Sequence, residues 1–207
     1  MRIAFVLTSS LDSPPALGRY FPLARHLVRL GHDVHVVALH HDLPSATSRR
    51  FMRQGVEVHY AGQMHIRKVG DATLYFDRPS ALARVVARGT VGLAWRALQL
   101  DADVYHVGKP HPQNGVAGLL ASRLRRRARL VVDCDDAEAV INRFGGGWQL
   151  AAVSWLEERL PRRADGVTVH SVQVSPTVNL SYAVFDRKLV ISTQPQGIDQ
   201  VRSGGEN

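Results

Sequence analysis

The sequence contains very little cysteine and very little lysine. Cys134 is the only cysteine, so the 207 residues form no internal disulfide and a reducing compartment is expected. Only three of the 26 basic residues are lysines, and the formal net charge of +8 therefore comes almost entirely from arginine. A charge of this sign favours an acidic partner, but an arginine-rich composition also arises from a GC-rich genome without any functional cause.

Long apolar segments are also missing. No run approaches the roughly 20 apolar residues that cross a bilayer, and the N-terminus lacks the apolar stretch and cleavage site of a signal peptide. We therefore expect a cytoplasmic protein, at most peripherally bound to the inner face of the membrane. The basic residues lack the interleaved aromatics or reading motif of nucleic-acid-binding proteins. We expect no nucleic-acid partner, and the charge favours an anionic membrane surface or a phosphate-bearing substrate.

Glycine is scarce where a nucleotide-binding loop needs it. The loop after the first apolar run, 9–19, holds only Gly18, whereas a dinucleotide-binding turn requires three spaced glycines for backbone to approach a pyrophosphate. A Walker A loop is absent as well, and we expect no cofactor. Gly18 either eases the turn into the following helix or lets backbone amides at that helix N-terminus hold a phosphate.

Short apolar runs alternate with stretches of helical periodicity along the whole chain. This alternation predicts an α/β fold: a single domain with a doubly wound, mainly parallel, Rossmann-like sheet of about seven strands. Glycines at 89 and 92 are expected to break the second helix in two. The predicted strands are 2–8, 33–39, 56–60, 104–107, 129–133, 166–170 and 189–192, and the predicted helices begin near residue 21 and span 81–100, 115–124, 148–160 and 171–183.

Polar residues follow each predicted strand, at the edge where ligands gather in such sheets. The segment 104–115 (VYHVGKPHPQNG) is the richest of these, because it combines histidine, lysine and asparagine with two prolines that restrict the backbone. Lys109 is expected to neutralise a phosphate and His111 to donate to a sugar hydroxyl. The candidate residues of this segment are His106, Lys109, His111 and Asn114.

Three carboxylates occur within residues 133–136, where the strand predicted at 129–133 ends. They suggest either a divalent-metal site or, more simply, a cap for the next helix. No second carboxylate cluster or HxH spacing elsewhere completes a metal shell, so no metal is expected. Asp135 is the residue that we expect to contact a ligand, with Asp136 beside it.

Six segments in this order resemble the family 4 glycosyltransferases of the GT-B fold. The last of them is similar to the segment that leads into the second domain of these enzymes. The resemblance covers almost all of the chain. The segments are RIAFVLT, LARHLVRLGHDVHVV, DADVYHVGKPHPQNGVAGLLASRL, RLVVDCDD, LPRRADGVTVHS and QPQGID.

The resemblance implies an enzyme that moves a sugar from a nucleotide-sugar to an acceptor with retention at the anomeric carbon. The acceptor would lie mainly on this domain and the donor mainly on a C-terminal one. Gly18 would lie near the donor phosphates, and His106 and Asp135 would be catalytic. Asp135 stands where many relatives carry a histidine, and an aspartate donates a hydrogen bond only when it is protonated. Gly197 belongs to the segment that leads into the donor domain.

The resemblance places the acceptor-side domain at 1–194 and a remnant of the interdomain linker and tail at 195–207. Only eight residues follow Asp199, so the donor domain is expected on a separate chain, and the exposed edge is expected to bind that chain or to self-associate. A truncated product and a non-catalytic binding or regulatory domain are the alternatives. An unrelated nucleotide-binding Rossmann protein is a third, which tight binding of NAD or ATP would favour.

Overall fold

The computed structural model describes most of the chain up to residue 192. The residues described are 1–13, 16–69, 72–76, 78–109, 111–134, 147–169, 171–175, 178–185 and 188–192.

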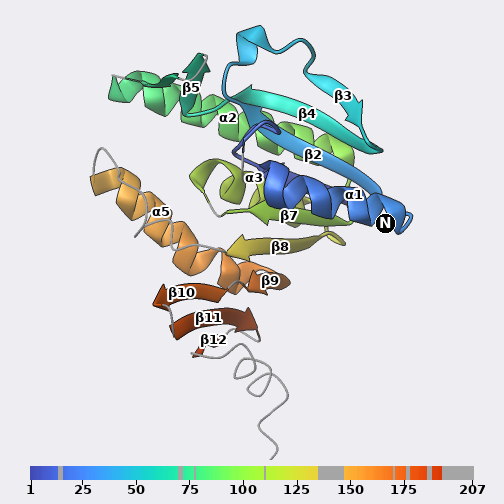
Figure 1. Ribbon diagram of the computed structural model, residues 1–207, viewed down its shortest axis with the longest axis vertical. Helices are drawn as coiled ribbons and strands as arrows, with labels where there is room; N and C mark the ends of the chain where they lie inside the picture. Colours follow the sequence, from blue (N-terminus) through green and yellow to red (C-terminus); the bar gives the residue numbers. More distant parts are fainter. Residues whose placement is uncertain are drawn as a thin grey trace, which may run out of the picture.

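A seven-stranded sheet forms the centre of the molecule, with the strand order β3-β4-β2-β1-β7-β8-β9 (Figure 1). All neighbouring strands are parallel except β3, which pairs antiparallel with β4 at the edge. The predicted α/β class with a mainly parallel Rossmann-like sheet is confirmed. The strands are β1 (Arg2–Leu7), β2 (Asp33–His40), β3 (Arg50–Arg53), β4 (Val56–Gln63), β7 (Val104–Gly108), β8 (Arg129–Cys134) and β9 (Gly166–Val169).

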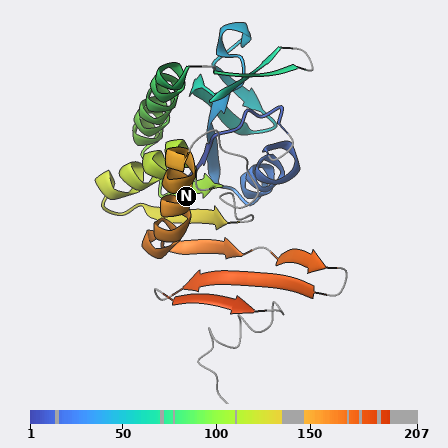
Figure 2. The same ribbon diagram turned by 90° about the vertical axis from the view of Figure 1, so that its left-hand side faces the viewer.

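Helices cover both faces of this sheet. Helix α1 lies on one face, and α2, α3 and α5 lie on the other (Figure 2). The helices are α1 (Phe21–Arg29), α2 (Pro79–Leu100), α3 (Pro112–Leu124) and α5 (Gly147–Arg159), and shorter helical turns are η1 (Ala16–Tyr20), η2 (Leu43–Ser45) and η3 (Pro161–Arg163).

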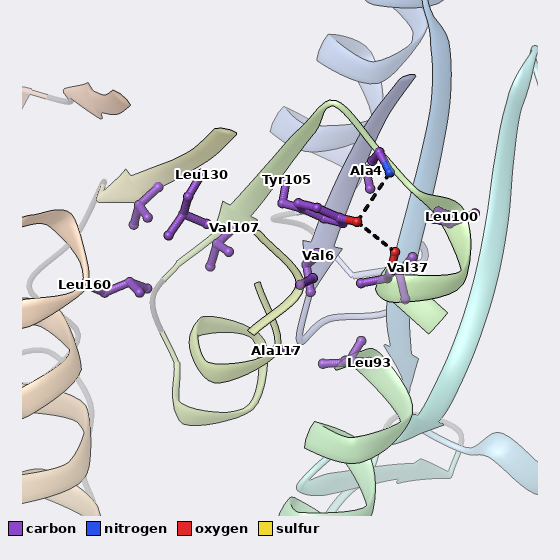
Figure 3. Packing of buried hydrophobic residues seen from close by; sticks show 14 of the residues in the cluster. Ala4, Val6, Val37, Leu93, Leu100, Tyr105, Val107, Ala117, Leu130 and Leu160 are labelled. Carbon is purple, nitrogen blue, oxygen red and sulfur yellow. Dashed lines mark hydrogen bonds between the residues drawn. The ribbon is translucent and has the colours of Figure 1, made fainter. Parts of the chain in front are cut away.

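Two apolar cores result, one on each face, because successive strand side chains point to opposite sides. In β1, Phe5 contributes to the core under α1, and Ala4 and Val6 contribute to the core under α2 and α3. Tyr105 of β7 is fully buried in the second core, and its hydroxyl donates to the Ala97 carbonyl at 3.1 Å (Figure 3). This bond ties the C-terminal part of α2 to the middle of the sheet.

Helix α2 is continuous, so the predicted break at its two glycines is wrong. The glycines instead let the helix approach β4 closely. A Cβ atom on Gly92 would lie 2.3 Å from the backbone oxygen of Ala61, and one on Gly62 would lie 3.2 Å from the Cα of Gly89. The low helix propensity of glycine is therefore outweighed by backbone packing that no larger residue permits.

The sequence prediction was also wrong at the C-terminal end of the described chain. Residues predicted as a helix at 171–183 form β10 (Ser171–Ser175) and most of β11 (Val178–Phe185). These strands form a separate antiparallel sheet with β12 (Lys188–Ser192), which was expected in the main sheet. Alternation of valine with polar residues in SVQVS is the period of a strand, and Pro176 interrupts any helix through this segment.

Three further strands lacked a clear signal in the sequence. Strand β3 belongs to the main sheet in place of the strand predicted at 189–192. A hairpin of β5 (Ile66–Val69) and β6 (Ala72–Tyr75) precedes α2. Each has only four residues, and none is a continuous apolar run. Helix α3 begins three residues earlier than the predicted 115, which places the last part of the polar segment on the helix.

We expect Gly92→Ala to destabilise the protein by about 1–3 kcal/mol, because the added methyl group overpacks against the Ala61 carbonyl. The gain in helix propensity, about 1 kcal/mol, only partly offsets this cost. Urea unfolding measures the difference. Gly147→Ala is the matched control, since a Cβ there meets nothing within 4 Å. Equal or higher stability of Gly92→Ala would contradict the packing explanation.

Candidate functional site

The carboxyl ends of β1, β7 and β8 lie side by side at one edge of the sheet, and Arg19 and Tyr20 contact β8 and β7 there. Gly18 lies in η1, in the segment after β1. A Cβ atom there would meet nothing within 4 Å, and Gly18 does not have a positive φ. Neither packing nor backbone conformation therefore requires glycine at this position. Open space beside the backbone is what a ligand that approaches closely needs.

Arg19 and Asp133 connect the segment after β1 to β8. The Nη1 atom of Arg19 lies 3.2 Å from the Oδ2 atom of Asp133, whose side chain is only 2% exposed. Thr168 of β9 donates to the other carboxylate oxygen at 2.5 Å. The carboxylate thus holds three segments together at the edge. The sequence prediction chose neither Arg19 nor Asp133 as a site residue, although Asp133 belongs to the carboxylate cluster at 133–136 and Arg19 follows Gly18.

His106 lies in the middle of β7 rather than beyond its end. Its ring packs against Phe5 with centroids 4.8 Å apart and against Tyr20 with centroids 6.2 Å apart. Its Nδ1 atom is buried and has no hydrogen-bond partner among the residues that the structure describes. Burial lowers the pKa of His106 to about 4, although the nearby Asp133 carboxylate favours the protonated form. The structure therefore places a neutral imidazole beneath the segment that carries Gly18.

The turn from β7 into α3 holds the other predicted residues of this segment. Lys109 adopts a left-handed backbone with φ 56°, and its N–H donates to the Asp133 carbonyl at 3.2 Å. His111 is the N-cap residue of α3, and its N–H donates to the Lys109 carbonyl at 2.7 Å. Both side chains are partly exposed, so they are accessible at the edge.

Asn114 is fully buried in the first turn of α3. Its Nδ2 atom lies within donating distance of the carbonyl oxygens of Val6 at 3.1 Å, Gly108 at 2.6 Å and Lys109 at 2.9 Å. These bonds join α3 to the ends of β1 and β7. The geometry gives Asn114 a structural role in shaping the turn, and its predicted contact with a ligand stays a prediction.

A second group of polar residues lies at the ends of β2 and β4. The hydroxyl of Ser10 lies 3.1 Å from Nδ1 of His41, which follows β2. Gln63 at the end of β4 donates to the His41 carbonyl at 2.7 Å and accepts from the Leu43 N–H at 2.9 Å. Burial, together with the nearby His111, lowers the pKa of His65 to about 4. His65 thus brings a neutral imidazole towards His111, a proximity that the sequence did not signal.

The remaining predicted site residues, Asp135, Asp136 and Gly197, lie outside the described residues, and so does the linker segment 195–207. The described residues of the edge combine a cation, histidines and an open backbone. These groups are suited to a phosphate and to the hydroxyls of a sugar.

We expect stability to fall as the pH decreases from the ordinary histidine pKa of 6.5 towards 4, in part because of His106. Its folded pKa is lowered, so the unfolded chain takes up the proton first and is stabilised relative to the folded chain in this window. Replacement by leucine removes the titrating group. The loss of unfolding free energy between pH 7 and pH 5 should then shrink by on the order of 2 kcal/mol. Urea unfolding at both pH values measures it, and an unchanged pH dependence would contradict a buried neutral His106.

Residues 19–176 match the family model described as "Glycosyl transferase 4-like domain". No curated protein matches the sequence. The fold is similar to that of sucrose-phosphate synthase from Thermosynechococcus elongatus, with a TM-score of 0.51 and 12% identity, over 81% of this chain and 41% of that one. This chain thus spans less than half of the similar structure. Because the family model covers more than half of the sequence, the chain belongs to the glycosyl transferase 4-like domain family.

Proposed function

We propose that this chain is the acceptor-binding half of a glycosyltransferase, and that a separate C-terminal domain binds the nucleotide-sugar donor. The observation that carries the proposal is the carboxyl edge of a glycosyl transferase 4-like domain, where Asp133 binds both Arg19, next to Gly18, and the Lys109 N–H. The similar sucrose-phosphate synthase is matched over only 41% of its length, which leaves room in that protein for a second domain.

Each residue of the edge has a distinct role in this proposal. The backbone beside Gly18 approaches the donor phosphates, and the Lys109 ammonium neutralises them. His111 donates to a hydroxyl of a sugar. Asp135, with Asp136, contacts the reacting sugar, and Gly197 belongs to the connection between the domains. The chain would bring the acceptor to the donor, since proximity and orientation supply a large part of the rate acceleration.

His106 bears on the alternative, a non-catalytic binding or regulatory domain derived from such an enzyme. Its ring is 7% exposed and packs against Phe5 and Tyr20, so it meets no substrate in this conformation. A catalytic part for His106, as the family resemblance implies, requires the segment after β1 to move away from it. In the alternative, the buried ring is only part of the core.

We expect the 207 residues alone to transfer no sugar from any nucleotide-sugar, and transfer to appear when a matching donor domain is added. Catalysis needs both reactants held in register, and one half binds only one of them well. Release of the nucleotide in the presence of acceptor measures turnover. Robust turnover by the isolated chain would refute the division into two halves, and no turnover with any donor domain would favour the non-catalytic alternative.

Lys109→Ala should lower activity of the reconstituted enzyme by about tenfold or more, because a charge-assisted bond to phosphate is lost. Its melting temperature should stay nearly unchanged, since alanine tolerates the left-handed backbone no worse than lysine does. His111→Ala should behave in the same way.

Asn114→Ala is the contrasting control. It removes the Nδ2 contacts with three carbonyl oxygens and should destabilise the chain by about 1–3 kcal/mol. If Lys109→Ala instead loses stability and keeps activity, the lysine is structural and the proposed phosphate contact is wrong.

The outer surface of α2 supports an anionic membrane as an additional partner. Arg84 and Arg88 are exposed there, and so are Val91 (68%) and Trp95 (65%). The 22 residues of the helix include no acidic side chain. Arginine with tryptophan is typical of helices that lie at a bilayer interface. No helix in the described part of the chain combines the length and apolarity that a bilayer crossing demands.

We expect the chain to float with phosphatidylglycerol vesicles at low salt and to remain behind at high salt, because screening weakens surface charge attraction. Replacing Arg84 and Arg88 together by glutamine should weaken binding by roughly 30-fold, at about 1 kcal/mol for each arginine. Neutral phosphatidylcholine vesicles are the control. Equal flotation with both lipids, or no effect of the double replacement, would contradict an electrostatic membrane contact through α2.

A further inference from the structure

A groove opens on the lateral edge of the sheet, between β3, β4 and α2. It has a volume of about 360 Å³ and lies away from the ends of β1, β7 and β8. Gly92 packs against Ala61 and lets α2 form one wall close to β4. Its lining residues are Arg49, Arg50, His59, Tyr60, Ala61, Gly92, Trp95 and Arg96.

Three guanidinium groups line this groove, and only one of them is neutralised by a carboxylate. Arg50 pairs with Glu57. Arg96 instead donates to the imidazole of His59, with Nη2 2.9 Å from Nδ1, and to the side chain of Gln99 at 2.8 Å. Arg49 is exposed. Within the described part of the chain neither Arg49 nor Arg96 has a carboxylate partner, so the groove carries an excess of positive charge.

The same region contains the atoms of a conceivable metal site, which must be weighed against an anion site. One ligand atom each from His35, Glu57 and His59 lies within 4.8 Å of the others. Arg96 donates to Nδ1 of His59, so the ring proton sits on Nε2, which faces Glu57 at 3.6 Å. Nε2 therefore has no lone pair to offer a metal ion.

The charges around the cluster also disfavour a cation. Two guanidinium groups contact it, Arg50 at Glu57 and Arg96 at His59. Burial and the adjacent Arg96 lower the pKa of His59 to about 4, so a neutral imidazole fits both the hydrogen bond and the surrounding positive charge. The arrangement favours an anion in the groove over a metal ion beside it.

We propose that the groove lined by Arg49, Arg50 and Arg96 binds a phosphate group. Planar guanidinium groups match the geometry of phosphate oxygens and bind them through two parallel bonds. The groove volume of about 360 Å³ is roughly twelve times the space that one water molecule takes in the liquid, about 30 Å³. A phosphate group, which has five heavy atoms, therefore leaves room for a small substituent. The indole of Trp95, exposed at the wall, packs against that substituent. A soluble phosphomonoester and a lipid head group both carry this chemistry.

The proposal does not rest on the proposed glycosyltransferase function. The groove shares no residue with the edge that carries Gly18, Lys109 and His111. Phosphate binding in the groove and sugar transfer at the edge therefore succeed or fail separately in experiment.

The test uses the full chain with Trp148 and Trp155 replaced by phenylalanine, so that Trp95 is the only fluorescent indole. Inorganic phosphate is titrated against sodium chloride at matched ionic strength. We expect a saturable change in Trp95 emission with phosphate alone. Arg49→Gln and Arg96→Gln should each weaken binding by about tenfold, the effect of one lost charge-assisted bond. Circular dichroism verifies the fold, and Arg49→Gln keeps the test valid if Arg96→Gln fails to fold.

The matched control replaces Arg126 and Arg127, which are exposed and do not line the groove, by glutamine. This double variant should bind inorganic phosphate as the parent does. A response that does not saturate, or an equal loss of binding in the control, would overturn the proposal. Competition then identifies the source: glycerol 3-phosphate that displaces inorganic phosphate indicates a soluble ligand, and displacement only by phosphatidic acid vesicles indicates a lipid head group.

Discussion

The burial of both faces of the parallel strands is the constraint on which the rest of the structure depends. Strands β1, β2 and β7 are covered by α1 on one side and by α2 and α3 on the other. Water is excluded from both faces, so buried polar side chains there need partners within the protein. The proposed ligand sites lie where this cover ends. One is at the carboxyl edge of the sheet, and another is at the lateral edge beside β3 and β4.

At the carboxyl edge, buried hydrogen bonds fix the backbone that carries the partly exposed side chains of Lys109 and His111. Asn114 binds the ends of two strands, and Asp133 binds the segment after β1 to β8 through Arg19. Lys109 is held in a left-handed conformation between these anchors. The ligand proposed for this edge would meet a surface whose shape is set in advance, which reduces the ordering cost of binding.

The elements that the sequence predicted well are those with continuous apolar runs. Strands such as RIAFVL are buried on both faces, and their composition reports that burial directly. Edge strand β3, with the sequence RFMR, has no such pattern because only its pairing with β4 makes it a strand. The glycines of α2 were misread since their value lies in contact with β4, which is distant in sequence.

Site residues were predicted by chemical type, and that is less informative than position. His106 and Lys109 are three residues apart, but one lies in a core and the other at the edge. The alternation of side chains along a strand separates its two faces, but it does not show how deeply other elements bury each face. The ion pair of Arg19 could not be predicted from local sequence, because its partner Asp133 is 114 residues away.

Strand β3 has one more consequence, for how this protein meets other chains. An unpaired sheet edge invites a strand from another molecule, and uncontrolled pairing of this kind leads to aggregation. Here the edge strand is four residues long, antiparallel to its neighbour, and begins and ends with the arginines Arg50 and Arg53. So short and charged an edge discourages the addition of a foreign strand. Specific assembly on that side therefore relies on side-chain recognition instead of shared backbone hydrogen bonds.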